Sequence, residues 1–345
     1  MSSSNGLSGF IKIGTAGNDD NNKRIDRIIR TIIPSLSLGS IYKEIRQGRI
    51  RINGEKTASG NRINTGDSID IHKSLAEIVK KDVEAIISKK KDPKISPDFK
   101  ELKIEILFEN SFFIVINKPS GILTHTGAKT SKNNFTLDDV IKKMFIKKSQ
   151  ESLAFSPAPL HRLDKETSGV LFFSKSIEGA RIFTSFLRKK MFTKKYIALL
   201  DGHLSKNCTW KDLLTREEKE NKNPSENKEA VTHIKPLLYS SGHTLALVEI
   251  ETGRFRQIRK QCAMHGFPLS GDKYSTPSMK KRIFDSAKND FLLHCWKIEL
   301  KDKKDMENTE KPGFDCITAP LPKLFIKKIN ALFGEDNIRK LFIDN

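Results

Sequence analysis

Residues 161–173, HRLDKETSGVLFF, set a dense polar turn directly against an apolar run. The apolar half, Val170 to Phe173, predicts a buried strand. We therefore expect Asp164 to lie on a loop that a buried strand holds rigid, and loops fixed in this way are where catalytic groups are commonly placed. An Asp in such a turn more often has only a structural role, in which its side chain accepts hydrogen bonds from the backbone of the turn. From residue types alone, a structural role for Asp164 is the more common outcome.

Composition predicts a basic globular protein of about two domains. The 345 residues include 62 Lys and Arg against 42 Asp and Glu, a net charge of +20. Such a charge reflects either a solubility bias or a polyanionic partner, and only its placement separates the two. No apolar run reaches the roughly 20 residues of a membrane helix, and the first residues do not resemble a signal peptide. We expect a cytoplasmic protein that does not enter membranes.

The four cysteines are widely spaced and form no C-x-x-C pair, and the eight histidines are scattered. These spacings argue against a zinc module and against a disulfide framework. We therefore predict no metal site.

Residues 1–22 are rich in Ser, Gly, Asn and Asp and are expected to form a disordered tail. Isoleucines at helical spacing then predict a helix that starts near Ile25 and ends before Pro34. A second helix is expected from Ile41 to Gln47, with Ser40 as its cap. Asn53-Gly54 predicts a hairpin turn after a short strand. These elements make a small helix–helix–hairpin module over residues 23–73.

Basic residues are concentrated on this module rather than spread evenly. Arginines dominate, which fits a phosphate-binding surface better than a neutral solvated face. The segment resembles the S4 RNA-binding domain in RIDRIIRTII, IYKEIRQGRIRINGEK and TGDSIDI. The candidate RNA-binding residues are Arg24, Arg27, Lys43, Arg46, Arg49 and Arg51.

A lysine-rich connector is expected over residues 74–103, with room for one short helix before Pro93. Residues 104–345 should form the second domain. Strand and helix signals alternate irregularly there, so a mixed, largely antiparallel sheet flanked by helices is predicted rather than a doubly wound one. Residues 205–230 are polar and are interpreted as an exposed loop. The fold class expected is α+β, with a small N-terminal α/β module.

Three separated stretches are expected to converge on a site. They are the HRLD turn, the strand that carries Tyr196, and residues 254–259, RFRQIR. Each has an ordinary explanation, because a strand tyrosine is usually core and clustered arginines usually bind phosphate or carboxylates.

Together these stretches resemble a known family. HRLDKETSG, with NKPSGILTH before it and ETGRFRQIRKQCAMHGFPLSGDKYS after it, is similar to the pseudouridine synthases that act on bacterial large-subunit ribosomal RNA. The resemblance covers residues 23 to about 325, and the S4-like segment is most similar to the C-type members. It implies an isomerase without a cofactor and with ribosomal RNA as partner, expected to be a monomer. A mixed sheet flanked by helices is the fold that it implies.

The resemblance also implies roles for individual residues. Asp164 matches the essential carboxylate, which acts at the ribose of an everted uridine either as nucleophile at C1′ or as base at C2′. Arg259 matches its arginine partner, and Tyr196 matches a tyrosine that stacks on the base and serves as proton acceptor. Arg162 matches the residue that fills the gap left by the everted base. Further substrate contacts are expected from His161, Arg254 and Leu293.

The chain departs from the family pattern at two positions. Arg256 and Gln261 stand where relatives commonly have histidine, which leaves the catalytic carboxylate and its partner intact but weakens inference about the RNA substrate. Two alternatives stay open: a non-catalytic RNA-binding or ribosome-assembly factor, and an isomerase that acts on transfer RNA.

Overall fold

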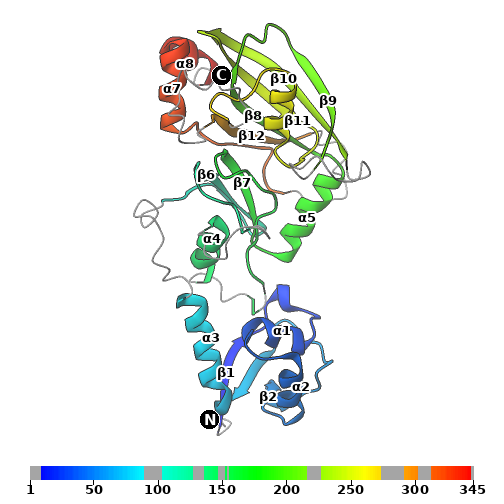
Figure 1. Ribbon diagram of the computed structural model, residues 1–345. Helices are drawn as coiled ribbons and strands as arrows, with labels where there is room; N and C mark the ends of the chain where they lie inside the picture. The colour runs from blue at the N-terminus through cyan, green and yellow to red at the C-terminus, as the bar shows by residue number, and fades with distance from the viewer. Residues whose placement is uncertain are drawn as a thin grey trace. The chain divides into compact units, whose positions relative to one another are not determined.

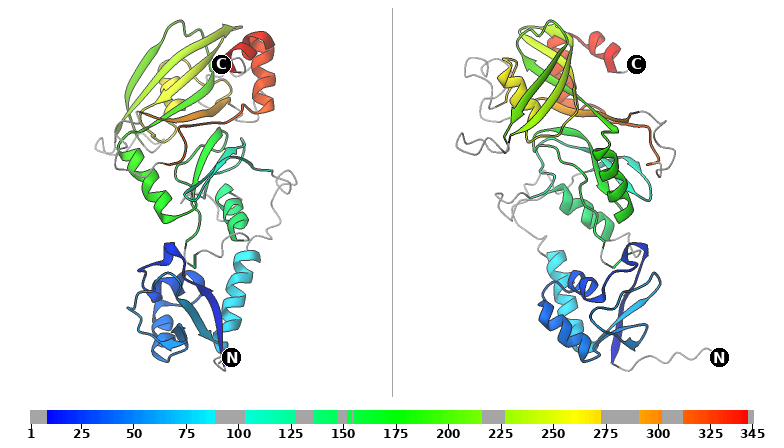
Figure 2. Two further views of the ribbon diagram at one scale, coloured as in Figure 1. Left: turned by 180° about the vertical axis from the view of Figure 1, so that it is seen from behind. Right: turned by 90° about the vertical axis from the view of Figure 1, so that its right-hand side faces the viewer.

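The computed structural model describes residues 9–88, 103–126, 136–146, 152–153, 155–215, 227–272, 291–301 and 312–342. These residues form two compact units (Figures 1 and 2). The first comprises the chain up to residue 102 together with residues 138–158 and 176–178. The second comprises residues 103–137, 159–175 and 179–345.

The first unit is built on a sheet of order β1-β4-β2-β3. Its strands are β1 (Phe10–Thr15), β2 (Ile50–Ile52), β3 (Glu55–Lys56) and β4 (Ser68–His72). Its helices are α1 (Ile25–Ile32), α2 (Leu38–Arg46) and α3 (Ala76–Ser88), with short 3-10 helices η1 (Asn18–Asp20) and η2 (Lys73–Leu75), and it contains all but the first residue of α4 (Leu137–Ile146).

Isoleucine fills the core of this unit. Ile25, Ile28 and Ile29 of α1 are fully buried, and they pack in one cluster with apolar residues of α2, β2 and β4. Asn53 and Gly54, both with positive φ, form the predicted hairpin turn between β2 and β3. The expected helix–helix–hairpin order is confirmed.

Two expectations for this part of the chain need correction. The stretch from Phe10 to Thr15 is not part of a tail: it is β1, an edge strand antiparallel to β4. The second helix begins at Leu38, three residues early, because Ser37 rather than Ser40 accepts the capping hydrogen bond from the backbone. The helix expected in the connector is confirmed as α3, which has 13 residues. Residues 1–8 and 89–102 lie outside the described residues.

The second unit is built on a nine-stranded sheet, counted over the residues described, of order β5-β6-β7-β12-β8-β11-β10-β9, with β13 paired to β12. The β7–β12 pairing is parallel and the other strand pairings described are antiparallel. The expected mixed, largely antiparallel sheet is confirmed. Its first six strands are β5 (Glu105–Glu109), β6 (Phe113–Lys118), β7 (Ser168–Ser174), β8 (Phe192–Asp201), β9 (Cys208–Leu214) and β10 (Lys228–Ser240). The remaining strands are β11 (His243–Ile250), β12 (Leu293–Leu300) and β13 (Cys316–Thr318).

The prediction of a loop over residues 205–230 is wrong at both ends. Cys208–Leu214 form β9, and Lys228 begins β10. β9 alternates between exposed and buried side chains, with Trp210 and Leu214 facing inward. Thr209, Lys211 and Leu213 face outward, and the charged Lys211 and Asp212 in the middle of the strand made it resemble the polar residues around it. Residues 216–226 lie outside the described residues.

Helices cover this sheet on both faces. α7 (Lys323–Phe333) and α8 (Glu335–Phe342) pack on buried residues of β8 and β11, while α6 (Gln257–Met264) lies on the opposite side (Figure 2, right). α5 (Ile177–Arg188) contributes Phe183 and Phe186 to a cluster of aromatic rings that also contains Phe113, Phe172 and Phe192. The sheet is therefore a rigid support for the loops at its edges.

Candidate active site

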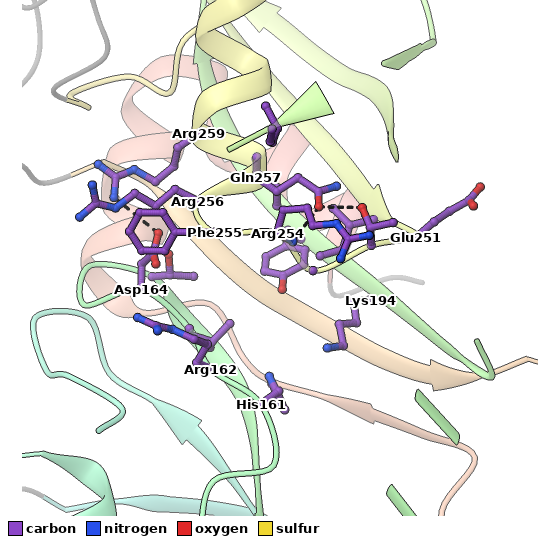
Figure 3. A pocket seen from close by; sticks show the side chains of 18 of the residues that line it. His161, Arg162, Asp164, Lys194, Glu251, Arg254, Phe255, Arg256, Gln257 and Arg259 are labelled. Carbon is purple, nitrogen blue, oxygen red and sulfur yellow. Dashed lines mark hydrogen bonds and ion pairs between the residues drawn. The ribbon is translucent and has the colours of Figure 1, made fainter. Parts of the chain in front are cut away.

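The second unit contains a cleft of about 890 Å³. All seven residues predicted for catalysis or substrate contact in this unit line it (Figure 3). They are His161, Arg162, Asp164, Tyr196, Arg254, Arg259 and Leu293. The expected convergence of the three stretches is therefore observed.

The Asp164 loop is held by Lys118, the last residue of β6, and by Thr124, which follows that strand. The Lys118 side chain is fully buried, and its Nζ donates hydrogen bonds of 2.8–2.9 Å to the carbonyls of Pro119, Lys165 and Thr167. The Thr124 hydroxyl donates to the carbonyl of Leu163. Backbone on both sides of Asp164 is thus fixed, although Asp164 itself stays partly exposed, with 20% of its side chain accessible.

The polar turn ends at Gly169, where the backbone conformation and a close neighbouring strand require glycine. Its φ is +112°, and a Cβ there would lie 2.2 Å from the carbonyl oxygen of Cys295 on β12. Only glycine permits both this conformation and this approach. The neighbouring Ser168 joins the same two strands through a 2.8 Å hydrogen bond to Nδ1 of His294. The loop carrying Asp164 is thereby tied to β12.

Arg259 lies between two carboxylates. Its Nη1 is 3.5 Å from Oδ2 of Asp164, while Nε and Nη2 donate to Asp272 at 2.7 and 2.6 Å. The Asp272 side chain is completely buried, and the guanidinium also lies 4.4 Å from the ring centre of Phe291. Asp272 therefore fixes the orientation of the Arg259 guanidinium, and Nη1 of Arg259 is the nitrogen directed toward Asp164.

Tyr196 lies across from Cys295 in the β8–β12 pairing and is almost fully buried, with an exposed fraction of 6%. Burial, followed by the neighbouring Cys295 thiol, raises the pKa of Tyr196 well above its usual range. The phenol therefore stays neutral at physiological pH. This environment suits stacking on a base and hydrogen bonding, and it disfavours a phenolate.

Lys194 places a cation in the same cleft, two residues before Tyr196 on β8. Burial lowers its pKa, and the nearby Cys295 opposes that effect. His161 lies close by: its Nε2 accepts a hydrogen bond from the backbone of Phe172, and burial together with the charge of Lys194 lowers its pKa well below 6.5. His161 is thus neutral and anchored to the strand behind the loop.

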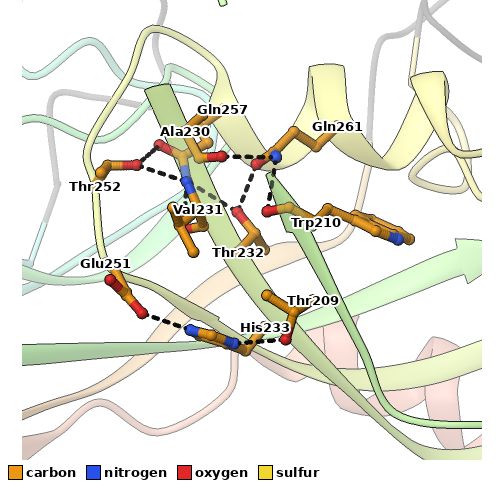
Figure 4. Close-up of polar contacts among 10 residues, drawn as sticks. All are labelled: Thr209, Trp210, Ala230, Val231, Thr232, His233, Glu251, Thr252, Gln257 and Gln261. Atoms are coloured by element: carbon orange, nitrogen blue, oxygen red, sulfur yellow. Dashed lines mark hydrogen bonds and ion pairs between the residues drawn. The ribbon is translucent and has the colours of Figure 1, made fainter. Parts of the chain in front are cut away.

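A buried polar network orders the loop before α6 (Figure 4). The Gln257 Oε1 accepts hydrogen bonds from Thr252 Oγ1 and from the backbone of Arg254. Gln261, at one of the two family histidine positions, is fully buried and bonds to Thr232 Oγ1 and Asp212 Oδ2 at 2.6 and 2.7 Å. This departure from the family pattern therefore falls on a buried side chain that joins α6 to strands β9 and β10.

The six predicted RNA-binding residues lie in the first unit and differ in their surroundings. Arg27, Lys43 and Arg46 are exposed. Arg24 pairs with Asp26 at 2.7 Å and Arg49 with Glu44 at 3.2 Å. The guanidinium of Arg51 donates to the carbonyls of Gly48 and Gly54 and lies 4.0 Å from the centre of the Phe10 ring. Arg51 therefore has structural contacts of its own.

Comparison with known proteins identifies the family. A model of the RNA pseudouridylate synthase family matches residues 112–264. A ribosomal large subunit pseudouridine synthase C of Rickettsia felis is 32% identical over 299 residues, covering 81% of this chain and 89% of the relative. The chain belongs to the pseudouridine synthase family.

Two further similarities agree with this membership. The ribosomal large subunit pseudouridine synthase C of Buchnera aphidicola subsp. Baizongia pistaciae is 30% identical, over 88% of this chain and 91% of the relative. The structure of human RNA pseudouridylate synthase domain containing 4 matches with a TM-score of 0.52 at 19% identity, over 72% of this chain and 96% of that one. The latter supports the shared fold.

Three residues of the cleft or its support were not predicted from the sequence. Asp272 lies outside the helices and strands and Lys118 is the last residue of β6, and nothing in their spacing indicates their buried partners. Lys194 could have been found, because it shares a strand face with Tyr196. Within the described ranges, no helix is long and apolar enough to cross a membrane, and no group of His, Cys, Asp and Glu side chains is arranged to hold a metal ion.

Proposed function

We propose that this protein converts uridines of large-subunit (23S) ribosomal RNA to pseudouridine, with Asp164 as the carboxylate that acts at the ribose. The observation that supports this most directly is the position of Asp164. It is partly exposed in the cleft, on a loop fixed on both sides, and 3.5 Å from the locked guanidinium of Arg259. The relatives named as ribosomal large subunit pseudouridine synthases support the substrate.

The reaction breaks the bond between N1 of uracil and C1′ of ribose and forms a bond from C5 to C1′. The C5 hydrogen leaves as a proton, and N1 gains one. Asp164 needs only to be ionised and correctly placed, either as nucleophile at C1′ or as base at C2′. The ordinary pKa of an Asp is near 3.9, so the carboxylate form is the natural one at neutral pH. Arg259 holds that charge in position.

The walls of the cleft suit a uracil that has left its helix. Tyr196 and Leu293 offer an aromatic and an aliphatic surface for the base, and Arg162 is placed beside Asp164 at the exposed edge of the loop. A target uridine must be everted, because its glycosidic bond is not accessible inside a stacked helix. In this proposal the neutral Tyr196 stacks on the uracil and hydrogen-bonds to it, and its phenolate takes no part.

The first unit is proposed as an S4-like RNA-binding module. Its exposed Arg27, Lys43 and Arg46 supply cations for phosphate contacts, which position RNA without reading its sequence. Arg24, Arg49 and Arg51 keep partners within the protein and are proposed to add positive potential around that surface.

The substrate is tested with purified full-length protein and RNA transcripts labelled with tritium at C5 of uridine, because each isomerisation releases one tritium to solvent. We expect release from the 23S transcript and none from a pool of transfer RNA transcripts. Release from transfer RNA alone would show that transfer RNA, and not 23S ribosomal RNA, is the substrate. Absence of release from either RNA, combined with retained RNA binding, would favour the non-catalytic alternative.

A further inference from the structure

Phe255 lies in the wall of the cleft, in the loop between β11 and α6. Its ring is only partly buried, and three cations lie around it. Arg256 Cζ is 4.7 Å from the ring centre, Lys260 Nζ 5.4 Å and Arg162 Cζ 5.9 Å. Figure 3 shows the ring on the same side of the cleft as Arg256 and Asp164. A partly exposed aromatic residue is therefore surrounded by positive charge.

The loop that carries Phe255 is already ordered. Arg256 caps α6 in the left-handed conformation, with φ +53°, and the buried Gln257 fixes the backbone at Arg254 and the side chain of Thr252. The Lys260 ammonium is held as well, by the carbonyl of Thr215 at 2.9 Å. The ring is thus presented on a rigid support.

An aromatic ring framed by cations has the chemistry of a single-strand nucleic-acid platform. Unpaired bases stack on such rings, while the neighbouring cations bind the phosphates on either side. The simpler alternative is that Phe255 only restrains Arg256 and Lys260 through cation–π contacts. Two observations favour the platform. Phe255 is partly exposed in the cleft wall. Lys260 is also held by its hydrogen bond to the carbonyl of Thr215, so it does not depend on Phe255 for its position.

We propose that Phe255 is a stacking platform for one unpaired nucleobase next to the target uridine, with Arg162 closing on the other side of that base. This inference rests on the proposed function. Two groups that stack on opposite faces of one base lie roughly 6.8 Å apart, which is twice the 3.4 Å spacing of nucleotides along a strand. The present 5.9 Å between Arg162 Cζ and the ring centre is slightly less, and the exposed Arg162 side chain has the freedom to open the gap.

The test uses two RNA hexamers with one uridine and the fluorescent base 2-aminopurine either before or after it. Stacking on Phe255 is expected to quench the fluorescence of one hexamer when full-length protein is added. Phe255→Leu should abolish that quenching and weaken binding about tenfold, the effect of losing one stacked base. Phe255→Trp should keep both. Tyr239→Leu, which removes an aromatic ring that is 48% exposed and not in the cleft wall, serves as the matched control.

The salt dependence of binding separates the platform from the restraint alternative. Loss of a stacking platform lowers affinity equally at all salt concentrations. Loss of a restraint on Arg256 and Lys260 instead reduces the log–log slope by roughly 0.7 for each phosphate that is no longer bound. An unquenched wild-type complex with both hexamers, or a reduced slope in Phe255→Leu, would overturn the proposal. Thermal unfolding checks that Phe255→Leu is folded, and quenching by Phe255→Trp tests the platform independently of that variant.

The outcome for the platform is distinguishable from the outcome for the proposed function. Tritium release from the 23S transcript measures the reaction, whereas quenching of the hexamers measures stacking. If both hold, Phe255→Leu should raise the KM for the transcript about tenfold and leave kcat nearly unchanged, because the ring touches a neighbouring base and not the reacting atoms. Quenching without tritium release would reject the proposed function and show that Phe255 stacks on a base without a target uridine beside it.

Discussion

Asp272 binds Arg259 more closely than Asp164 does. Two hydrogen bonds of 2.6 and 2.7 Å join Asp272 to the guanidinium, whereas Asp164 lies 3.5 Å from its remaining nitrogen. Asp272 is fully buried and Asp164 is partly exposed. Arg259 thus has a structural partner and a catalytic candidate as neighbours. The carboxylate that would react is the one held more loosely.

Removing the charge of Asp272 should damage both stability and activity. Asp272→Asn leaves the buried Arg259 without its main counter-charge, so the free energy of unfolding should fall by about 3 kcal/mol or more. The kcat for tritium release should fall more than the KM changes, because Arg259 no longer holds Asp164. Glu109→Gln breaks the more exposed pair with Lys175 and should cost at most about 1 kcal/mol. Equal effects of the two variants in chemical denaturation would contradict this role.

Lys118→Met should make the Asp164 loop less rigid, because it removes the side chain that bonds to the backbone of that loop. Three backbone carbonyls that now accept from its ammonium would lose their donor, and each buried unsatisfied group costs about 1–3 kcal/mol. We expect a loss of several kcal/mol in unfolding free energy and a lower kcat. Lys165→Met, at a lysine on the same loop with 57% of its side chain exposed, should change stability by roughly 0.5 kcal/mol or less. A Lys118→Met protein as stable as wild type would refute this support role.

His294 should make the protein sensitive to acid. Its Nε2–H faces the carbonyl of Ala319, and its Nδ1 accepts from Ser168, so the neutral ring fits both partners. Burial lowers the pKa of His294 to about 4. Between pH 6.5 and 4 the unfolded chain therefore binds a proton that the folded protein does not. The free energy of unfolding should decrease over this range as pH falls, by at most about 3 kcal/mol.

The variant His294→Gln should show a shallower loss of stability between pH 6.5 and 4 in thermal or chemical unfolding. The matched control is His203→Gln, which removes an exposed histidine and should keep the wild-type slope. Parallel pH profiles for wild type and His294→Gln would show that this histidine is not the acid-sensitive group.

Much of the fold was predictable because its signals are local. The isoleucine spacing of α1, the Asn53-Gly54 turn and the apolar run of β7 each follow from side-chain periodicity or turn chemistry. β1 was missed because it is a short edge strand beside a stretch rich in Gly, Ser and Asn. β9 was missed because the charged Lys211 and Asp212 lie in the middle of it.

The site was predictable in its main residues but not in its supports. Asp164, Tyr196 and Arg259 lie in motifs that resemble a family, so their convergence could be expected. Asp272 and Lys118 act through partners that are 13 and 47–49 residues away in the chain, apart from the adjacent Pro119. Such pairings depend on tertiary structure, and no local pattern indicates them.

RNA binding by the first unit should depend steeply on salt. Arg27→Gln, Lys43→Gln and Arg46→Gln each remove an exposed cation, and the log–log slope should fall by roughly 0.7–0.9 for each phosphate that the protein no longer neutralises. Arg51→Gln should instead lower stability, because Arg51 holds two carbonyls of its own unit. Lys327→Gln, at an exposed lysine of α7, is the control. An affinity for 23S transcript that does not change with salt would exclude this mode of binding.

The most direct test of the catalytic assignment is tritium release by Asp164→Asn with the labelled 23S transcript. The substitution keeps the size of the side chain and removes its charge, so the loop and the cleft should be preserved. We predict that release falls below detection while affinity for the transcript stays within about threefold of wild type. Undiminished release by Asp164→Asn would contradict the assignment of Asp164 as the catalytic carboxylate.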